Sequence, residues 1–330
     1  MPIRVNRISK HFRLFKREAG FSGALKSFIN RKYEDFHALE NISINVEDGE
    51  ILGILGENGA GKTTLIKILV GLLHPSSGEV DINGFIPWER KTEFLKQISV
   101  VMGQKNQLWW DIPASESFLL NRNIYEIPEK NYNKILDELV DLLDVKDKLD
   151  VQVRRLSLGE RMKMEIIAAL LHNPKVVLLD EPTIGLDVIS QSKIRDFVKF
   201  YNQEYNTTFI LTSHYMHDIQ ALCKRVYVIN KGVSLYDGDF EVLTNKINPR
   251  RKLLFEFSMP PDTRVIDKLL TQYKFTLKNN FLEAELPSDD LTSLVSELFK
   301  MDTPNSITLE DLPVEDTMRS FFLEPEKFIK

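Results

Sequence analysis

Short apolar runs recur along roughly the first 240 positions and predict buried strands, while stretches with helical spacing lie between them. The runs of about five residues are Ile51–Leu55, Ile98–Met102, Val176–Leu179 and Thr208–Thr212. Such runs are short and bounded by turn residues, which favours strands over helices. Helical spacing is visible at Thr64–Val70 and Tyr132–Leu143. This alternation predicts an α/β fold for the first three quarters of the chain.

Beyond residue 249 the pattern changes to a shorter alternation of strands and helices. The predicted strands are Lys252–Ser258, Asn280–Leu286 and Ser306–Glu310, and the predicted helices are Thr263–Tyr273 and Leu291–Phe299. We therefore expect two domains, 1–245 and 246–330, the second a small α+β module with a ferredoxin-like order. It carries no catalytic motif. A dimer-stabilising or regulatory role and a passive stabilising role both remain open.

The segment between the first run and the first helix carries the clearest chemistry. It matches G-x-x-x-x-G-K-[ST], the phosphate-binding loop, and the expected phosphate-binding residues are Gly56, Asn58, Gly59, Ala60, Gly61, Lys62, Thr63 and Thr64. The glycines let backbone N–H groups turn toward phosphate oxygens at the positive end of a helix dipole. We predict that Lys62 binds the β- and γ-phosphates of ATP and that the Thr63 hydroxyl ligates Mg²⁺.

A second motif ends the run Val176–Leu179 with two carboxylates, Asp180 and Glu181. In phosphoryl transfer to water, one carboxylate of such a pair holds Mg²⁺ and the other polarises the attacking water. We assign Asp180 to the metal and Glu181 to the water, with Lys62 as a further catalytic group.

Upstream of that pair lies Leu156-Ser157-Leu158-Gly159-Glu160, and here the chain resembles the nucleotide-binding subunits of ATP-binding cassette (ABC) transporters. Their signature is usually L-S-G-G-Q, from which this chain departs at Leu158 and Glu160. The resemblance implies that Ser157, Gly159 and Glu160 contact the ATP bound by a second cassette.

Further positions follow the family's order and take their roles from the resemblance. Gln104 matches the Q-loop glutamine, which contacts Mg²⁺ and the water, and His214 matches the switch histidine, which holds the γ-phosphate. Asp187, in Gly185-Leu186-Asp187, matches the D-loop that communicates between subunits, and Phe12 matches the aromatic residue that stacks on adenine.

The resemblance also implies the architecture: a P-loop NTPase with a RecA-like core, an antiparallel β subdomain and an α-helical subdomain, the last at 105–160. Trp109 and Trp110 are candidates for the groove that this subdomain offers to a membrane partner, although core packing is the alternative. A basic insertion at 13–37 is predicted to lie as an amphipathic helix on a membrane or partner surface, or to be a solvated helix.

Composition limits the binding partners and the cellular compartment that we expect for the protein. Its 330 residues are 43% apolar with a net charge of −5, which argues against bulk nucleic-acid binding. The single cysteine, Cys223, suits a reducing compartment, and the apolar runs are too short to span a membrane. We expect a peripheral protein on the cytoplasmic face of the cell membrane, paired with a second cassette, as a homodimer, and with separate transmembrane permease subunits.

The segments Gly103-Gln104-Lys105-Asn106-Gln107-Leu108-Trp109-Trp110 and Asn83–Trp88 resemble a branch of ABC-2-type exporter ATPases, some of which export viologens. The favoured function is therefore an ATPase that drives export. A polysaccharide or teichoic-acid exporter is the runner-up, because basic insertions occur there too. A soluble ABC ATPase acting on the ribosome or on DNA is the alternative from another class.

Overall fold

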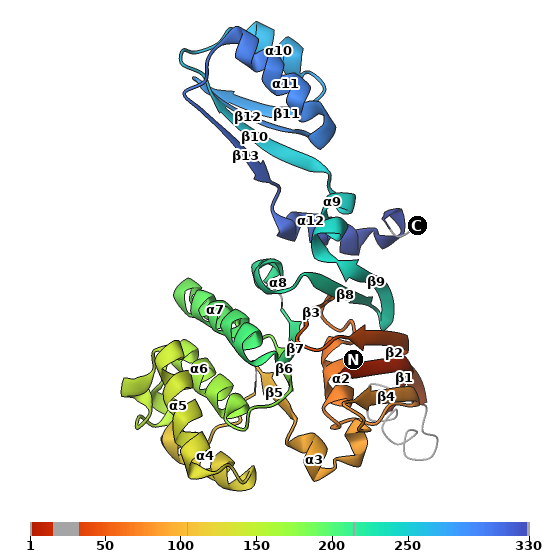
Figure 1. Cartoon of the computed structure of the whole chain (residues 1–330). Helices are drawn as coiled ribbons and strands as arrows, with labels where there is room; N and C mark the ends of the chain where they lie inside the picture. Colours follow the sequence, from red (N-terminus) through yellow and green to blue (C-terminus); the bar gives the residue numbers. More distant parts are fainter. Residues whose placement is uncertain (1, 16–32, 104, 214, 329–330) are drawn as a thin grey trace, which may run out of the picture. The chain divides into compact units, whose positions relative to one another are not determined.

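In the computed structural model, six strands form the central sheet of the first unit, in the order β5-β6-β7-β3-β8-β9 (Figure 1). Their bounds are Ile51–Leu55 (β3), Ile98–Met102 (β5), Val176–Asp180 (β6), Thr208–Thr212 (β7), Arg225–Asn230 (β8) and Val233–Asp239 (β9). The strand β3 pairs in parallel with β7 and β8, and β6 pairs in parallel with β5 and β7. The carboxyl ends of β3, β5, β6 and β7 therefore lie at one edge, where ligands of open α/β sheets bind.

Four helices pack near this sheet: Lys62–Leu69 (α2), Leu158–Leu170 (α6), Val188–Tyr205 (α7) and Met216–Leu222 (α8). Helix α2 contacts β6, α6 contacts β5, and α8 contacts both β3 and α7. Each strand of the parallel sheet thus follows or precedes a helix in the chain, as parallel pairing requires. The predicted α/β fold is confirmed.

A separate antiparallel sheet contains the first two strands of the chain. Its order is β2-β1-β4, with bounds Ile3–Phe15 (β1), Tyr33–Val46 (β2) and Ser77–Ile82 (β4). Strands β1 and β2 pair from Ile3↔Val46 to Phe15↔Tyr33. Both ends of the expected insertion 13–37 therefore continue these strands, and its predicted amphipathic helix falls on residues 16–32, outside the described part of the chain.

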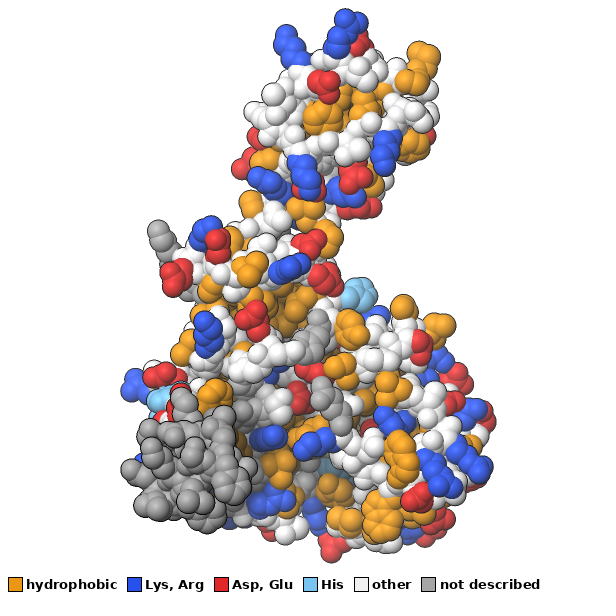
Figure 2. Space-filling model, turned by 180° about the vertical axis from the view of Figure 1, so that it is seen from behind, with side chains coloured by type: hydrophobic (Ala, Val, Ile, Leu, Met, Phe, Trp, Pro, Cys, Tyr) orange, Lys and Arg blue, Asp and Glu red, His pale blue; other side chains and the backbone are white. Residues whose placement is uncertain are grey.

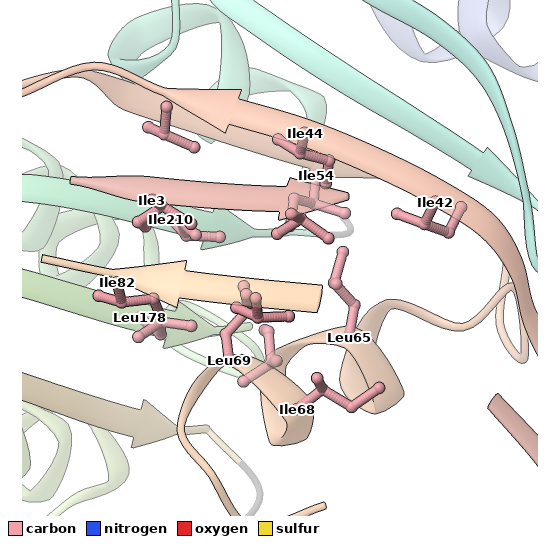
Figure 3. Close-up of a cluster of buried hydrophobic side chains, with 14 of the residues drawn as sticks. Ile3, Ile42, Ile44, Ile54, Leu65, Ile68, Leu69, Ile82, Leu178 and Ile210 are labelled. Atoms are coloured by element: carbon pink, nitrogen blue, oxygen red, sulfur yellow. The ribbon is translucent and has the colours of Figure 1, made fainter. Parts of the chain in front are cut away.

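One hydrophobic core joins the two sheets and α2 (Figure 3). Ile3, Ile42, Ile44 and Ile82 project from the antiparallel sheet toward Leu65 and Leu69 of α2 and toward Ile54, Leu178 and Ile210 of the central sheet (Figure 3). All are almost completely buried. Since apolar burial is the main favourable term in folding, this core fixes the start of α2 against the carboxyl edge of the central sheet.

The region between β5 and β6 is helical, as predicted. Besides α6 it contains Ala114–Ile124 (α4), Glu129–Leu143 (α5) and the 3-10 helices Lys146–Lys148 and Val153–Arg155. Helices α4 and α5 both contact α6. A short link between β4 and β5 holds the 3-10 helix Pro87–Glu89 and Thr92–Leu95 (α3).

The second unit, Asp239–Lys330, contains a four-stranded antiparallel sheet in the order β11-β12-β10-β13. Its elements are Phe240–Ile247 (α9), Arg250–Glu256 (β10), Thr263–Leu270 (α10), Lys274–Lys278 (β11), Phe281–Pro287 (β12), Ser288–Met301 (α11), Ser306–Asp311 (β13), Val314–Leu323 (α12) and the 3-10 helix Pro325–Lys327. From β10 to β13 the order is β-α-β-β-α-β, which is ferredoxin-like. The sequence prediction missed β11, because that strand is short and three of its five residues are exposed.

The structure describes residues 2–15, 33–103, 105–213 and 215–328. Within these ranges no helix is long and apolar enough to cross a membrane. Figure 2 shows acidic and basic side chains interspersed over one face of the chain, in keeping with its small net charge.

Candidate functional site

The loop from Gly56 to Gly61 joins the carboxyl end of β3 to the first turn of α2. Gly61 is the N-cap of α2 with φ +113°, and a Cβ there would lie 2.6 Å from the Ala38 carbonyl oxygen. Glycine is therefore required at this position. The described structure gives the first turn of α2 no side-chain cap. Its N–H groups and the positive helix end are thus suited to an anion such as a phosphate.

Lys62 places its ammonium over this loop. Its side chain is only 5% exposed, and Nζ donates to the carbonyl oxygens of Gly56 at 2.7 Å and Glu57 at 3.1 Å. Burial lowers the pKa of Lys62, while the nearby charges of Glu181 and Asp180 oppose that shift. The carboxylates thus help to keep a cation beside the loop.

Asp180, at the end of β6, is held by two hydroxyl groups. Thr63 Oγ1 donates to Asp180 Oδ2 at 3.2 Å, and Thr212 Oγ1 donates to Asp180 Oδ1 at 2.6 Å. The pairing of β6 and β7 sets Asp180 opposite Thr212. A carboxylate and a hydroxyl at hydrogen-bond distance are hard oxygen donors, which suit Mg²⁺. Thr63 and Asp180 therefore fit the predicted metal.

Glu181 follows Asp180 with an unusual backbone conformation. Its φ is +56°, and its N–H donates to Thr212, both to the carbonyl oxygen at 3.0 Å and to Oγ1 at 3.1 Å. Gly103 packs closely on the other side, since a Cβ there would lie 2.1 Å from the Glu181 carbonyl oxygen. A strained residue held from both neighbouring strands has a fixed position, as a catalytic carboxylate needs.

A cavity of about 120 Å³ opens beside these side chains. It is lined by Thr63, Lys67, Met102, Gly103, Lys105, Asp180 and Glu181. Lys67 and Lys105 were not predicted from the sequence. Lys67 lies four residues after Thr63, so helical spacing alone could have placed both on one face of α2.

Two predicted site residues, Gln104 and His214, lie outside the described residues. Their neighbours in the chain, Gly103 and Ser213, follow the carboxyl ends of β5 and β7.

A buried polar network centred on Asp218 includes Ser213, and the sequence analysis did not predict it. The Asp218 carboxylate, in α8, accepts from Ser213 Oγ at 2.8 Å, from Arg195 Nη1 at 2.8 Å and from the Thr183 hydroxyl. It joins the turn after β6 to the end of β7. Nothing in the sequence spacing indicates this meeting, because it depends on the packing of α7 against α8.

The signature residues form the start of α6. Ser157 is the N-cap, its Oγ accepting from Glu160 N at 3.2 Å, while Glu160 Oε2 accepts from Ser157 N at 2.8 Å. This is a capping box. The backbone hydrogen bond from Ser157 holds the pKa of Glu160 below its usual value. The glutamate that departs from the usual signature therefore has a local structural role.

The signature also packs on the predicted D-loop of the same chain. A Cβ on Gly159 would lie 2.4 Å from Ser190 Oγ, and that hydroxyl donates to Asp187 Oδ2 at 2.7 Å. Asp187 caps α7 by accepting from Ser190 N at 2.9 Å. Ser157 and Gly159 are not among the described residues that line the cavity beside Thr63.

Phe12 lies in β1, away from the core. It stands opposite Phe36 in the β1–β2 register, and the Lys10 ammonium lies 5.2 Å from the centre of its ring. The ring is partly exposed, so it has a face on which a base can stack.

Comparison with known families and curated proteins gives consistent results. Residues 39–184 match the family model described as ABC transporter. The chain is 34% identical over 218 residues to the ABC transporter ATP-binding protein NatA of Bacillus subtilis (strain 168), covering 65% of this chain and 88% of NatA. It is 29% identical to the bacitracin transport ATP-binding protein BcrA of Bacillus licheniformis, covering 90% and 94%. It is also 33% identical to the methionine import ATP-binding protein MetN of Geobacillus kaustophilus (strain HTA426), covering 72% and 71%.

Solved structures give the same fold. The chain resembles cbiO1 from Clostridium perfringens, part of the cbiONQ ABC transporter complex, with a TM-score of 0.60 and 26% identity over 74% of this chain and 91% of cbiO1. It also resembles the ATP-binding cassette MJ0796 in a dimeric, post-hydrolysis state bound to ADP and Pi, with a TM-score of 0.60 and 23% identity over 72% of this chain and 98% of MJ0796.

Proposed function

Because the chain belongs to the ATP-binding proteins of ABC transporters and is an ABC-type ATPase, we propose that it powers export of a substrate through separate transmembrane subunits. The observation that carries this proposal is that Thr63, Asp180 and Glu181 line one cavity at the carboxyl edge of the central sheet, and that the two carboxylates lie near the Lys62 ammonium. These residues come from two distant motifs, and phosphoryl transfer needs both.

ATP binding rests on the loop and on Lys62. We propose that the N–H groups at the start of α2 take up the β- and γ-phosphates, and that Lys62 exchanges its carbonyl partners for phosphate oxygens. Asn58, Ala60 and Thr64 belong to the same phosphate-binding segment, and Phe12 is the proposed adenine platform. Positioning and electrostatics then carry most of the rate enhancement.

Hydrolysis rests on Glu181. We propose that its carboxylate accepts a hydrogen bond from the attacking water and orients it in line with the γ-phosphate, with Gln104 and His214 completing the site. Thr63 and Asp180, with Gln104, would hold Mg²⁺, which when bound would neutralise charge on the transferring phosphoryl group. The hydroxyl of Thr212 keeps Asp180 in the orientation that this role requires.

A second cassette is proposed to complete each site. Ser157 and Gly159 cap and pack the start of α6 and do not line the cavity of their own chain within the described residues. They are therefore proposed to meet the ATP held by a partner, together with Asp187 and Glu160. The dimeric state of the related cassette MJ0796 supports a pair of this kind. We propose a homodimer, since this one sequence carries both the proposed catalytic residues and the signature residues that a partner site would need.

Export, in the branch related to ABC-2 exporters, is proposed from the resemblance of the segments 83–88 and 103–110 to that branch. The similarity to BcrA covers 90% of this chain, so it extends beyond the first unit into the second. The similarity to the import protein MetN covers 72%. On this proposal the protein lies at the cytoplasmic face of the membrane.

The exposed aromatic pair after β5 is the proposed contact for the membrane subunits. Trp109 is 61% exposed and Trp110 43% exposed, so core packing does not explain them. Leu119 and Ile124 of α4 are exposed as well. Exposed tryptophans favour binding interfaces because they supply large apolar area.

The test is a pull-down of the tagged Glu181→Gln protein with ATP from detergent-solubilised membranes of the native cell, followed by mass spectrometry. Recovery of polytopic membrane proteins supports the transport function. Additional recovery of enzymes that synthesise a polysaccharide or teichoic acid would favour an exporter of such a polymer. Recovery of ribosomal or DNA-repair proteins without a membrane protein would overturn the proposal.

A matched pair of variants sharpens the test. Trp109→Ala combined with Trp110→Ala should lose the membrane partner, whereas Phe281→Ala, which removes a ring of intermediate exposure (56%) from the second unit, should retain it. Equal recovery with both variants would exclude the tryptophans as the contact.

A further inference from the structure

Glu165, in the third turn of α6, has a contact that the nucleotide chemistry described above does not use. Its side chain is 3% exposed, and its carboxylate accepts from two consecutive backbone N–H groups. Gln107 N donates to Oε1 at 2.9 Å and to Oε2 at 3.1 Å, and Leu108 N donates to Oε1 at 3.2 Å. The segment that leaves β5 is thereby fastened to α6 by one side chain.

Further contacts hold this segment against α6 and β5. The Arg161 guanidinium, one helical turn before Glu165, lies 5.2 Å from the centre of the Trp110 ring. Gln107 Nε2 donates to the Val100 carbonyl oxygen at 2.5 Å, which ties the segment back to β5. Leu108 is itself buried. The segment 107–110 is therefore held between β5 and α6.

A carboxylate is an expensive group to bury for packing alone. Burial raises the pKa of Glu165, and the two backbone hydrogen bonds and the charge of Arg161 oppose that shift. An apolar side chain would fill this place at lower cost but would leave two buried N–H donors without an acceptor. The acceptor function therefore accounts for the residue.

The position of Glu165 relates two motifs. Gln104 lies three residues before Gln107, and Ser157, the N-cap of α6, lies eight residues before Glu165, which corresponds to about 12 Å along a helix. A helix moves as a stiff body over this length. A shift of the two N–H groups would therefore reach the start of α6.

We propose that Glu165 is a positioning residue that transmits displacement of the segment 107–110 to the signature residues Ser157 and Gly159. This inference rests on the proposed function, in which the segment meets a membrane subunit and the signature meets the partner's ATP. Glu165 touches neither ATP nor the reacting atoms. It acts through α6.

The experiment compares Glu165→Ala and Glu165→Gln with wild type in the full chain. ATP affinity is measured by titration, kcat and KM by steady-state hydrolysis, and the amides of Gln107 and Leu108 by hydrogen exchange. The Glu165→Ala protein should retain ATP affinity within about twofold while kcat falls by about tenfold or more. The two amides should exchange at least about tenfold faster while α6 stays protected. The Glu165→Gln protein should lie between, because its amide oxygen still accepts.

Asn121→Ala is the matched control. Asn121 Nδ2 donates to the Ala168 carbonyl oxygen at 3.3 Å, so this variant also removes a hydrogen bond to α6, but one that does not involve the segment 107–110. Its kcat should stay near that of wild type. A second readout is ATP-dependent dimerisation in the Glu181→Gln background, which should require more ATP when Glu165→Ala is added.

Three results would overturn the inference. The first is normal kcat and dimerisation despite faster exchange at Gln107 and Leu108. The second is unchanged hydrogen exchange at these amides. The third is loss of protection throughout α6 in both Glu165→Ala and Glu165→Gln, which would show that Glu165 is needed for folding of the helix. None of these measurements uses a membrane subunit. A pull-down without a membrane protein would therefore count against the proposed transport function, whereas the three results above would count against the role of Glu165.

Discussion

The Thr63 hydroxyl donates a hydrogen bond to Asp180 Oδ2 across 3.2 Å, although 117 positions separate the two residues in the chain. Thr63 belongs to the first turn of α2 and Asp180 to the last residue of β6. The contact joins the predicted phosphate-binding loop to the acidic motif, and these two side chains are the ones that would hold the proposed metal.

Replacing Thr63 by Val should remove one of those oxygens without changing the volume of the side chain greatly. We expect Mg²⁺-dependent ATP hydrolysis to fall by about a hundredfold, equivalent to about 2.7 kcal/mol in the activation free energy. Thr63→Ser, which keeps the hydroxyl, is the control and should stay within a few-fold of wild type. Steady-state turnover over a range of Mg²⁺ concentrations measures the effect. Equal loss in both variants would argue against a metal-ligating hydroxyl.

Glu181→Gln should bind ATP but stall as a closed dimer, because an amide cannot accept the proton of the attacking water. Light scattering with and without ATP measures the dimer, and phosphate release measures turnover. Lys62→Ala provides the contrast, since it should lose ATP affinity and therefore the dimer as well. Normal turnover in the Glu181→Gln protein would reassign the general base.

Removal of residues 239–330 tests the second unit. The cut belongs before Asp239 because α9 contacts α12 within that unit, and a cut at residue 249 would leave buried side chains of α9, such as Phe240 and Leu243, without their cover. We expect the shortened protein to bind ATP normally and to dimerise more weakly in the Glu181→Gln background. If the shortened protein dimerises at the same ATP concentration as the full chain, the second unit has no role in dimerisation.

The stability of the protein should depend on pH through His172. Burial lowers the pKa of His172 from 6.5 to about 4, so between these values the unfolded chain binds the proton more readily than the folded chain. Stability is then highest above pH 6.5 and decreases as the pH falls toward 4. From pH 7.5 to 5 the decrease attributable to this group is about 2 kcal/mol.

Urea unfolding at several pH values measures this dependence. His172→Phe is the informative variant because it keeps a ring that can stack on Tyr125, whose ring centre lies 3.9 Å from that of His172. The variant should show a flatter dependence on pH. An unchanged slope would assign the acid sensitivity to other groups.

The sequence alone predicted the phosphate-binding motif, the strand that ends at Asp180 just before Glu181, and the class of fold. Each of these depends on residues close together in the chain, so apolar runs and motif spacing are sufficient. The helices α10 and α11 of the second unit were predicted for the same reason, whereas α9 and α12 were not predicted. The strand Lys274–Lys278 was not, because its polar exposed face gives little apolar signal.

Only the tertiary structure decided which side chains meet. The parallel register sets Thr212 against Asp180, the packing of α7 and α8 brings Arg195 to Asp218, and the position of α6 under the segment after β5 gives Glu165 its two N–H donors. These pairs are 23 to 58 positions apart. Contacts at such separations depend on how strands align and helices pack, which local patterns along the chain do not encode.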